Sequence, residues 1–273
     1  MQGYMNIEAF KKLIWKYYKE NKRILPWREE ISPYGVVVSE LMLQQTQVSR
    51  VLVKYPDFLD KFPDFATLAT APFDKLLRVW QGMGYNRRAK YLQQIAQKIT
   101  EEYGGVLPED TSILETFPGI GPATASAIIT YTYNKPEVFI ETNIRRIYIH
   151  HFFSDAEGIA DTDIFPFVAK TVHTENPREW YYALMDYGTA LAKTVENPNR
   201  RSKHYTKQSK FEGSNRQVRG SILKALLENG PLTKEDMVMV TTFERDRVYP
   251  VLDELAQEGF VKEERGKYII HNA

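Results

Sequence analysis

The stretch Phe117-Pro118-Gly119-Ile120-Gly121-Pro122 is the strongest indication of the fold, because it separates two apolar segments with helical spacing. Asp110 suits the N-cap of a short helix before it, and Gly121 and Pro122 suit the cap and first position of a helix after it. The two glycines allow positive φ angles and leave backbone N–H groups uncovered beside a helix N-terminus, which favours anions. We therefore expect a helix-hairpin-helix that binds a phosphate, with a plain interhelical turn as the alternative.

An acidic residue follows the hairpin by about twenty residues, just before a basic helix, in the segment Ile140-Glu141-Thr142-Asn143-Ile144-Arg145-Arg146. Together the two features resemble the helix-hairpin-helix DNA glycosylases, whose catalytic carboxylate lies at this distance from the hairpin. That family has Asp where this sequence has Glu141. The resemblance implies that Gly119 and Gly121 grip a DNA phosphate, that Glu141 is catalytic and that Asn143 contacts DNA.

Composition and charge limit the class of protein. The chain has 273 residues, 43% hydrophobic and 26% charged, which is enough for one large or two moderate globular domains. Because its net charge is only +1, any affinity for DNA must come from local patches. No apolar run approaches the ~18 residues of a membrane span, and the N-terminus has no signal-peptide core. We expect a cytoplasmic monomer that associates with the nucleoid when bound to DNA.

The sequence contains no cysteine. This excludes disulfides and an iron–sulfur cluster ligated by thiolates of this chain, although most relatives in the family it resembles carry such a cluster. We therefore expect no cofactor and no metal site, with a monovalent cation at the hairpin as the one alternative.

Glu40 stands out in an otherwise apolar helix that Ser32 and Pro33 are suited to begin. If its carboxyl group is buried, its pKa rises, and it becomes a candidate general acid near neutral pH. A solvated position on the outer face of the helix is the alternative.

Most of the remaining chain also has the apolar spacing of helices. We expect them over residues 7–18, 48–55, 87–103, 144–153 and 180–194, with two short ones between 67 and 83. Thr46 is placed to cap the helix that follows Gln44-Gln45. Up to residue 199 nothing predicts a β-sheet, so the fold is expected to be mainly α.

From Arg200 to Lys224 eight cations are opposed only by Glu212. Interleaved Tyr205 and Phe211 suit a segment that follows a DNA strand, although a flexible basic linker has the same composition. From this segment we expect Arg200, Arg201 and Lys203 to contact DNA.

The last 60 residues predict a small separate domain. A helix over 215–229 closes at Gly230, Thr233 caps a short helix, and Thr241 with Glu244 forms a capping box for a longer helix that ends at Gly259. Pro250 is awkward inside that last helix and shortens its regular part. Residues 260–261 and 268–270 alternate like a hairpin. Three helices and a two-stranded wing describe a winged helix-turn-helix, in which Arg247 is expected to contact DNA.

Within the glycosylases, residues 24 to 195 are most similar to the A/G-specific adenine DNA glycosylases. The similarity is carried by Leu25-Pro26-Trp27-Arg28, by Ser39-Glu40-Leu41-Met42-Leu43-Gln44-Gln45-Thr46-Gln47-Val48 and by Trp80-Gln81-Gly82-Met83-Gly84-Tyr85. It implies that Glu40 protonates adenine N7 and that Gln45 is a wedge pushed into the DNA stack, with Tyr85 against the strand. It also implies that the flipped adenine is contacted by Trp27, Arg28 and Asp186. For these three the alternatives are a core residue, a surface charge and a helix partner of a nearby base.

The reaction of this family explains the need for two carboxylates. Breaking the N-glycosidic bond requires a protonated leaving base and a stabilised oxocarbenium sugar, so one group donates a proton and the other stays anionic. Members that also cut the strand have Lys where this sequence has Ala123, so no amine is available there for a Schiff base. The expected function is a monofunctional DNA glycosylase acting on mispaired double-stranded DNA, most closely of the adenine type. A non-catalytic DNA-binding protein and a mismatch glycosylase for uracil or thymine remain alternatives.

The expected architecture is a two-lobed helix-hairpin-helix glycosylase fold followed by the winged helix. We expect one lobe to comprise residues 1–24 and 136–199, the hairpin lobe 25–135, the basic linker 200–213 and the winged helix 214–273.

Overall fold

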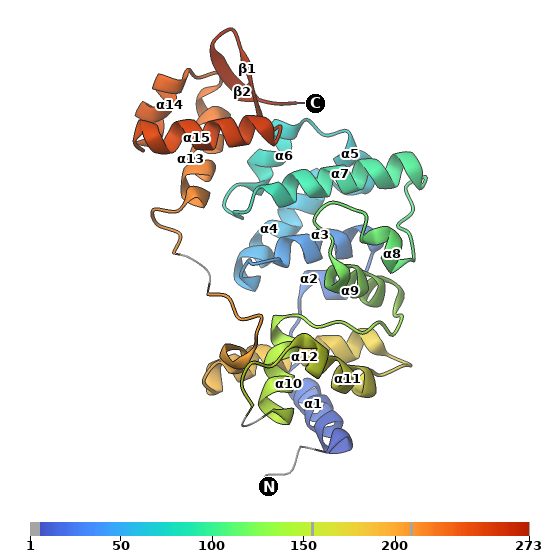
Figure 1. Ribbon diagram of the computed structural model, residues 1–273. Helices are drawn as coiled ribbons and strands as arrows, with labels where there is room; N and C mark the ends of the chain where they lie inside the picture. Colours follow the sequence, from blue (N-terminus) through green and yellow to red (C-terminus); the bar gives the residue numbers. More distant parts are fainter. Residues whose placement is uncertain (1–5, 154–155, 208–209, 273) are drawn as a thin grey trace. The chain divides into compact units, whose positions relative to one another are not determined.

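The computed structural model describes residues 6–153, 156–207 and 210–272, which are mainly helical. Its elements, in order, are α1 (Ile7–Asn21), α2 (Pro26–Glu29), α3 (Pro33–Leu43), α4 (Val48–Lys61), α5 (Phe65–Ala69), α6 (Phe73–Trp80), α7 (Arg87–Glu102), α8 (Thr111–Leu114), α9 (Pro122–Tyr133), α10 (Thr142–Phe152), α11 (Asp161–Thr171), α12 (Pro177–Thr194), the 3₁₀ helix η1 (Pro198–Arg201), α13 (Asn215–Asn229), α14 (Lys234–Thr241), α15 (Arg245–Gln257), β1 (Val261–Glu264) and β2 (Lys267–Ile270) (Figure 1).

The chain forms two compact units. The first unit comprises residues Met1–Glu40 and Leu107–Lys207, and the second comprises Leu41–Val106 and Gln208–Ala273. The first therefore holds the hairpin helices α8 and α9 together with α1 and α10 to α12. These units do not test the domain boundaries expected from the sequence, which stay a prediction.

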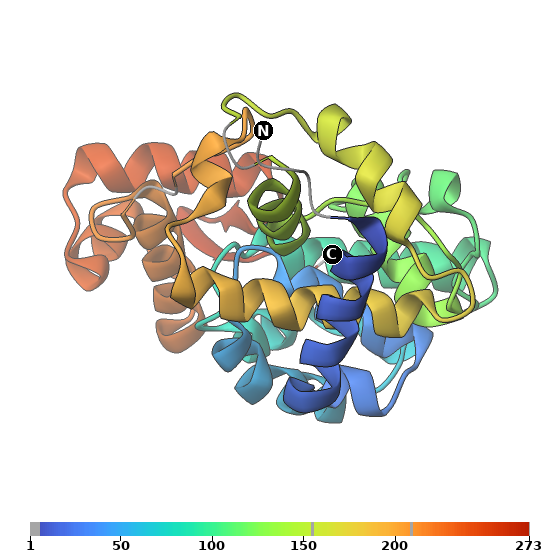
Figure 2. The ribbon, with the colours of Figure 1, turned by 90° about the horizontal axis from the view of Figure 1, so that it is seen from below.

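The core of the first unit is aromatic. Helix α1 packs against α12, as Figure 2 shows, and α10 packs against α12 and η1. Phe10 of α1 is fully buried, with ring centroids 5.1 Å from Tyr148, 5.0 Å from Phe152 and 6.3 Å from Trp180. Burying large rings removes much apolar surface from water, and this burial fixes α10 and α12 relative to one another.

In the second unit α5 packs on α7 and α4 on α6, and the three C-terminal helices and the wing complete the unit. The strands pair antiparallel, from Val261 with Ile270 to Glu264 with Lys267. The two residues between them, Arg265 and Gly266, have φ angles of 52° and 78°, as a tight hairpin turn requires. The winged helix-turn-helix predicted from the sequence is confirmed.

The winged helix is packed on α6 and α7 within the second unit. Phe260, fully buried, lies 5.5 Å from Phe73 between ring centroids. Glu258 accepts hydrogen bonds from the guanidinium groups of Arg87 and Arg219, and Lys90 donates to the Gly259 carbonyl at 3.2 Å. An apolar contact with α6 and polar contacts with α7 therefore join the C-terminal domain to the rest of the unit.

Several helix boundaries differ from the sequence-based expectations. Thr46 does not cap α4, whose N-cap is Gln47. The predicted Thr241–Glu244 capping box is wrong, because Thr241 lies inside α14 and donates to the Met237 carbonyl at 2.7 Å.

The two remaining differences concern whole helices. Helix α11 was not predicted, and α15 is regular from Arg245 onward in spite of Pro250.

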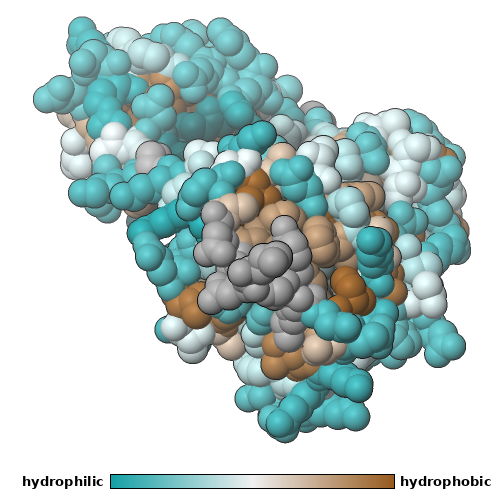
Figure 3. Space-filling view, turned by 60° about the horizontal axis from the view of Figure 1, so that its bottom comes forward, coloured by the Kyte–Doolittle hydropathy of each residue, from teal (hydrophilic) through white to brown (hydrophobic). Residues whose placement is uncertain are grey.

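Polar side chains cover most of the face shown in Figure 3. Among the described residues, no helix combines the length and the apolar character that crossing a membrane requires.

Candidate active site

Glu40 lies near the C-terminal end of α3, among buried residues, and is itself half-buried. Desolvation and, to a smaller extent, the negative charge of Glu141 raise the pKa of its carboxyl group to about 8, against the opposing positive charge of Arg28. At neutral pH Glu40 is therefore mostly protonated and able to donate. The general-acid chemistry expected of this residue has the environment it needs.

Glu141 is the N-cap residue of α10. Its Oε1 atom accepts hydrogen bonds from the backbone N–H groups of Asn143 at 2.8 Å and Ile144 at 3.3 Å. Burial raises the pKa of Glu141, but these two bonds and the charges of Arg146 and Arg145 oppose that rise. Among the described residues no backbone N–H group donates to Glu40, so the proton of the pair is favoured on Glu40 and the negative charge on Glu141.

Only one of the two carboxylate oxygens of Glu141 takes part in the helix cap. In the described part of the chain, Oε2 accepts no hydrogen bond. One oxygen thus fixes the group to the helix, while the other carries charge close enough to influence Glu40.

A buried ion-pair network holds Arg28 beside this pair. Arg28 Nη1 lies 2.9 Å and 3.1 Å from the two carboxylate oxygens of Asp186. Arg23 donates to the same carboxylate from Nε at 2.6 Å and from its backbone N–H at 2.9 Å. The Asp186 side chain is 1% exposed, so its charge is compensated by both arginines rather than by water. Asp186 is thus the shared partner of two arginines, and its expected contact with a flipped adenine stays a prediction.

Two tyrosines complete the surroundings of Glu40, and sequence reasoning missed both. The guanidinium of Arg28 lies 4.3 Å from the ring centroid of Tyr182, which stacks on Tyr131 at 5.0 Å and 15°. Burial is the main cause that raises the pKa of Tyr131, and the nearby Glu40 and Glu141 add to it, so its phenol is neutral and lies close to both carboxyl groups. Tyr131 lies on the helix that follows the hairpin, but its spacing alone does not separate it from a core residue. Trp27 is buried on α2.

The hairpin helices end and begin at the predicted residues, but only one of the two glycines has a positive φ, because the φ of Gly121 is −96°. Asp110 caps α8, accepting from Ser112 N–H at 2.8 Å, and Gly121 is the N-cap of α9 with Pro122 at its first position. Gly119 has a φ of 77°, and both glycines are exposed. No side chain caps α9, so its N-terminus is open to an anion.

Asn143, in the first turn of α10, is half-buried and lies next to the cap that Glu141 forms. Its Oδ1 accepts from Arg146 Nη1 at 2.6 Å. The structure brings Glu40, Glu141, Arg28 and Asp186 together in the first unit with Asn143.

Gln45 and Tyr85, which are expected to act as the wedge and to contact the DNA strand, lie in the second unit. Gln45 is exposed and has a φ of 52°, and Tyr85 has a φ of 47°. Arg88 joins their two turns: its guanidinium donates to Gln44 O at 2.6 Å, to Thr46 Oγ1 at 2.9 Å and to Gly84 O at 3.0 Å. Arg88 is only 5% exposed, although it lies on a helix rich in Arg, Lys and Gln.

The basic segment is only partly free for DNA. The guanidinium of Arg201 donates to backbone carbonyls of Phe153 and Ile149, where α10 ends, and Arg200 pairs with Glu196 at 2.6 Å. Lys203 is exposed. In the second unit Arg247 donates to the Gly213 carbonyl at 2.8 Å. Three of the four cations that were expected to contact DNA, Arg200, Arg201 and Arg247, therefore also have partners within the protein.

The residues present do not fit a thiolate-ligated iron–sulfur cluster, because the chain has no cysteine. The segment after α12 is instead tied to the lobe by hydrogen bonds. Asn199 donates to Thr142 O at 3.0 Å. The backbone N–H of Ile159 donates to Arg201 O at 2.9 Å, and the backbone N–H of Lys203 donates to Ile159 O at 2.9 Å. Within the described ranges, no group of three or more His, Asp or Glu residues is placed to hold a metal ion.

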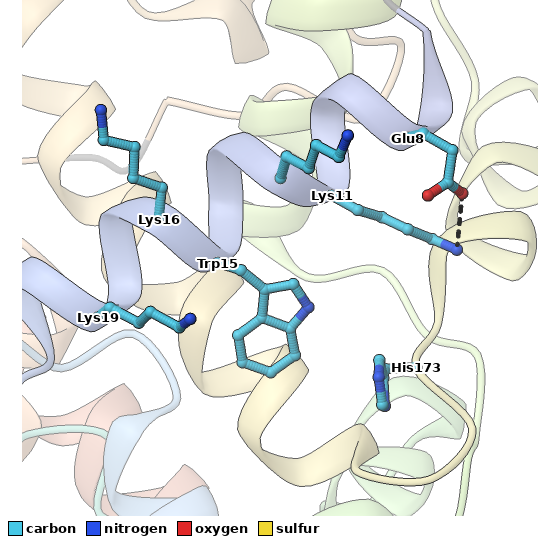
Figure 4. Close-up of a pocket in the computed structure, with 7 residues that line it drawn as sticks. Glu8, Lys11, Trp15, Lys16, Lys19 and His173 are labelled. Atoms are coloured by element: carbon cyan, nitrogen blue, oxygen red, sulfur yellow. Dashed lines mark ion pairs between the residues drawn. The ribbon is translucent and has the colours of Figure 1, made fainter.

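A separate hollow lies along α1 and contains none of these residues. It is lined by Glu8, Lys11, Lys12, Trp15, Lys16, Lys19 and His173. Figure 4 shows the Trp15 indole beside His173, with lysine side chains around it and the 3.6 Å ion pair between Lys11 and Glu8. The hollow is shallow and basic, and neither Glu40 nor Glu141 lines it.

Comparisons with known proteins agree with this geometry. A family profile described as HhH-GPD superfamily base excision DNA repair protein matches residues 38–163, and one described as sugar-specific transcriptional regulator TrmB matches residues 221–273. An adenine DNA glycosylase of Mycobacterium tuberculosis is 33% identical over 261 residues, covering 85% of this chain and 84% of that protein.

A second relative and a solved structure extend the comparison. An adenine DNA glycosylase of Mycolicibacterium smegmatis is 32% identical over 281 residues, covering 95% and 94% of the two chains. The solved structure of a thermostable thymine-DNA glycosylase superposes with a TM-score of 0.59 at 21% identity, covering 67% of this chain and 85% of that one. This likeness shows the shared fold.

Proposed function

This chain belongs to the HhH-GPD superfamily of base excision DNA repair proteins, among the adenine DNA glycosylases, and we propose that it excises mispaired adenine from double-stranded DNA. The observation that carries the proposal is the pairing of two glutamates with opposite tasks. Glu40 holds a proton at neutral pH, and Glu141 is kept anionic by the N-terminus of α10.

The reaction follows from these two states. Glu40 donates its proton to the ring nitrogen N7 of adenine, so that the base leaves as a neutral molecule when the C1′–N9 bond breaks. The anionic Glu141 stabilises the positive charge that develops on the sugar. Water then adds to C1′, its proton returns to a carboxylate, and an abasic site remains.

Arg28 is proposed to hold the flipped base. Its guanidinium is fixed by Asp186 and by the Tyr182 ring, so its position costs little entropy when the base arrives. The wedge Gln45 and the phosphate grip at Gly119 and Gly121 are proposed to offset the few kcal/mol that flipping the base costs.

The enzyme is proposed to be a monofunctional glycosylase that works as a monomer. The position of a Schiff-base lysine is occupied by Ala123, which has no amine. Base release without strand cleavage is therefore expected until alkali is added.

The test is excision from defined duplexes. The protein is incubated with duplexes that contain A opposite G, A opposite 8-oxoguanine, G opposite U or G opposite T, and alkali then reveals abasic sites. We expect cleavage of the adenine strand only after alkali, and no product with Glu40→Gln. Release of U or T in place of adenine would assign a different base. Binding without release from any duplex would indicate a non-catalytic DNA-binding protein.

A further inference from the structure

Tyr85 is held by two arginines that lie far apart in the sequence. It lies in the turn between α6 and α7 with a φ of 47°, a conformation that a tyrosine keeps only when its surroundings hold it. The guanidinium carbons of Arg88 and Arg216 are 5.5 Å and 5.1 Å from the centroid of its ring. Arg216 Nη1 also donates a hydrogen bond to the Tyr85 hydroxyl at 2.6 Å.

Arg216 comes from the winged helix. It lies in the first turn of α13, and Arg219, one turn later, pairs with Glu258, which also pairs with Arg87 of α7. The winged helix therefore contacts α7 through the ion pair between Glu258 and Arg87, and it contacts the turn of Tyr85 through Arg216. From that turn Arg88 continues the connection to the turn of Gln45.

The charges of α15 do not favour an independent DNA-reading role for this domain. The third helix of a winged helix-turn-helix is the one that enters the major groove. Here the segment Arg245–Gln257 carries two arginines against three carboxylates, so it has no excess of positive charge to attract phosphates.

We propose that Arg216 is a positioning residue through which the winged helix presents Tyr85 to the DNA beside the mispair. An aromatic ring that is already fixed loses little entropy when it stacks on a base. The winged helix thus contributes to recognition of mispaired duplex DNA without reading bases itself. This inference rests on the proposed function only in that Tyr85 meets the DNA.

A double-mutant cycle on DNA binding tests the coupling. The affinities of the full-length wild type, Arg216→Ala, Tyr85→Ala and the double variant are measured by fluorescence anisotropy on mispaired and fully paired duplexes. We expect Arg216→Ala to weaken binding to the mispaired duplex about tenfold, the size of one lost stacking contact, and to have no further effect once Tyr85 is alanine. The salt dependence of binding should stay the same, because no phosphate contact is removed.

Two controls keep the result interpretable. Arg216→Gln retains a hydrogen-bond donor and is expected to recover part of the loss, and thermal unfolding shows whether either variant is folded. Lys224→Ala removes a cation from the same helix without touching Tyr85, so it should change paired and mispaired affinities by the same factor.

Additive losses, or a salt slope reduced by about one, would show that Arg216 is an ordinary phosphate contact and would overturn the proposal. An unchanged affinity for the mispaired duplex would overturn it as well. The cycle measures binding alone. A protein that released no adenine would therefore contradict the proposed function, while the coupling between Arg216 and Tyr85 could still be measured.

Discussion

Glu40 and Glu141 have the same chemistry and different surroundings, and this difference predicts the pH dependence. The pKa of Glu40 is about 8, so excision should fall as the pH rises through that value and the proton is lost. Glu141 must be ionised, and its pKa is also raised above glutamate's ordinary value, so excision should fall again on the acidic side. Single-turnover rates measured across the pH range check both limbs. An alkaline limb that persists in Glu40→Gln with residual activity would assign the proton to another group.

The same shift in the pKa of Glu40 has a consequence for stability. A carboxyl group whose pKa is raised on folding stabilises the native state fully below 4.5, and this contribution is lost as the pH rises through about 8. Glu40→Gln should therefore be less sensitive to alkaline unfolding than the wild type. Thermal unfolding at neutral and alkaline pH measures the difference.

The cap geometry separates the charge of Glu141 from its structural role. An amide oxygen still accepts the bonds from Asn143 and Ile144, so Glu141→Gln should fold normally and lose excision, because the sugar's positive charge is no longer stabilised. Glu141→Asp should remain active, since Asp is among the preferred N-cap residues and keeps the charge. Single-turnover excision and thermal unfolding of both variants check this. Activity in Glu141→Gln comparable to the wild type would show that its charge is not used.

At the scale of elements, the crossing of α10 and α12 positions Glu141. A Cβ atom on Gly188 would lie 2.8 Å from Asn143 Cβ, 3.0 Å from Asn143 O and 3.1 Å from the Ile147 side chain. The first two distances involve the first turn of α10, directly after the Glu141 cap. Only glycine lets the two helices approach this closely.

Gly188→Ala should therefore push α10 away from α12. We expect a loss of about 1–3 kcal/mol in the free energy of unfolding, as for other overpacked sites, together with slower excision because Glu141 is displaced. Gly220→Ala is the matched control, because Gly220 also lies within a helix and its added Cβ would meet nothing within 4 Å. That control should be neutral or slightly stabilising. Equal unfolding curves for the two variants would contradict the close crossing.

At the scale of the whole molecule, the winged helix is part of the second unit's fold, and Glu258 is the charged centre of its attachment. Its side chain is 23% exposed between Arg87 and Arg219. These partners lower the pKa of Glu258 to about 2, so its stabilising contribution is present above 4.5 and is lost as the pH falls through about 2.

Glu258→Gln should destabilise the protein at neutral pH by about 1.5–3 kcal/mol, the range for hydrogen bonds to charged groups. The difference from wild type should shrink as the pH falls below 4.5, which chemical unfolding at several pH values measures. Glu264→Gln removes a carboxylate from an exposed pair on the wing and should change little. A constant difference between wild type and Glu258→Gln at all pH values would show that the charge does not hold the domain.

Local sequence determined much of this protein. Asp110, Gly121 and Pro122 fix the ends of the hairpin helices through bonds and dihedral preferences that involve only near neighbours. The same holds for the cap at Thr233 and the turn at Arg265 and Gly266, so the winged helix could also be predicted. Glu40 could be singled out because it stands in an otherwise apolar helix, and Glu141 because it precedes a basic helix at the distance from the hairpin that the resembled family has. Their catalytic roles stay predictions.

Tertiary structure alone decided which charges are used inside the protein. Arg88 and Arg201 lie in segments rich in charged residues, as surface cations do, yet their guanidinium groups donate hydrogen bonds to backbone carbonyls. Asp186 finds its partners Arg23 and Arg28 some 160 residues away in the chain. A buried charge is stabilised only by partners at hydrogen-bond distance, and which side chains reach that distance depends on how the helices pack. Local spacing contains no information on such packing, so it predicted where the helices lie and not which of their charges they bury.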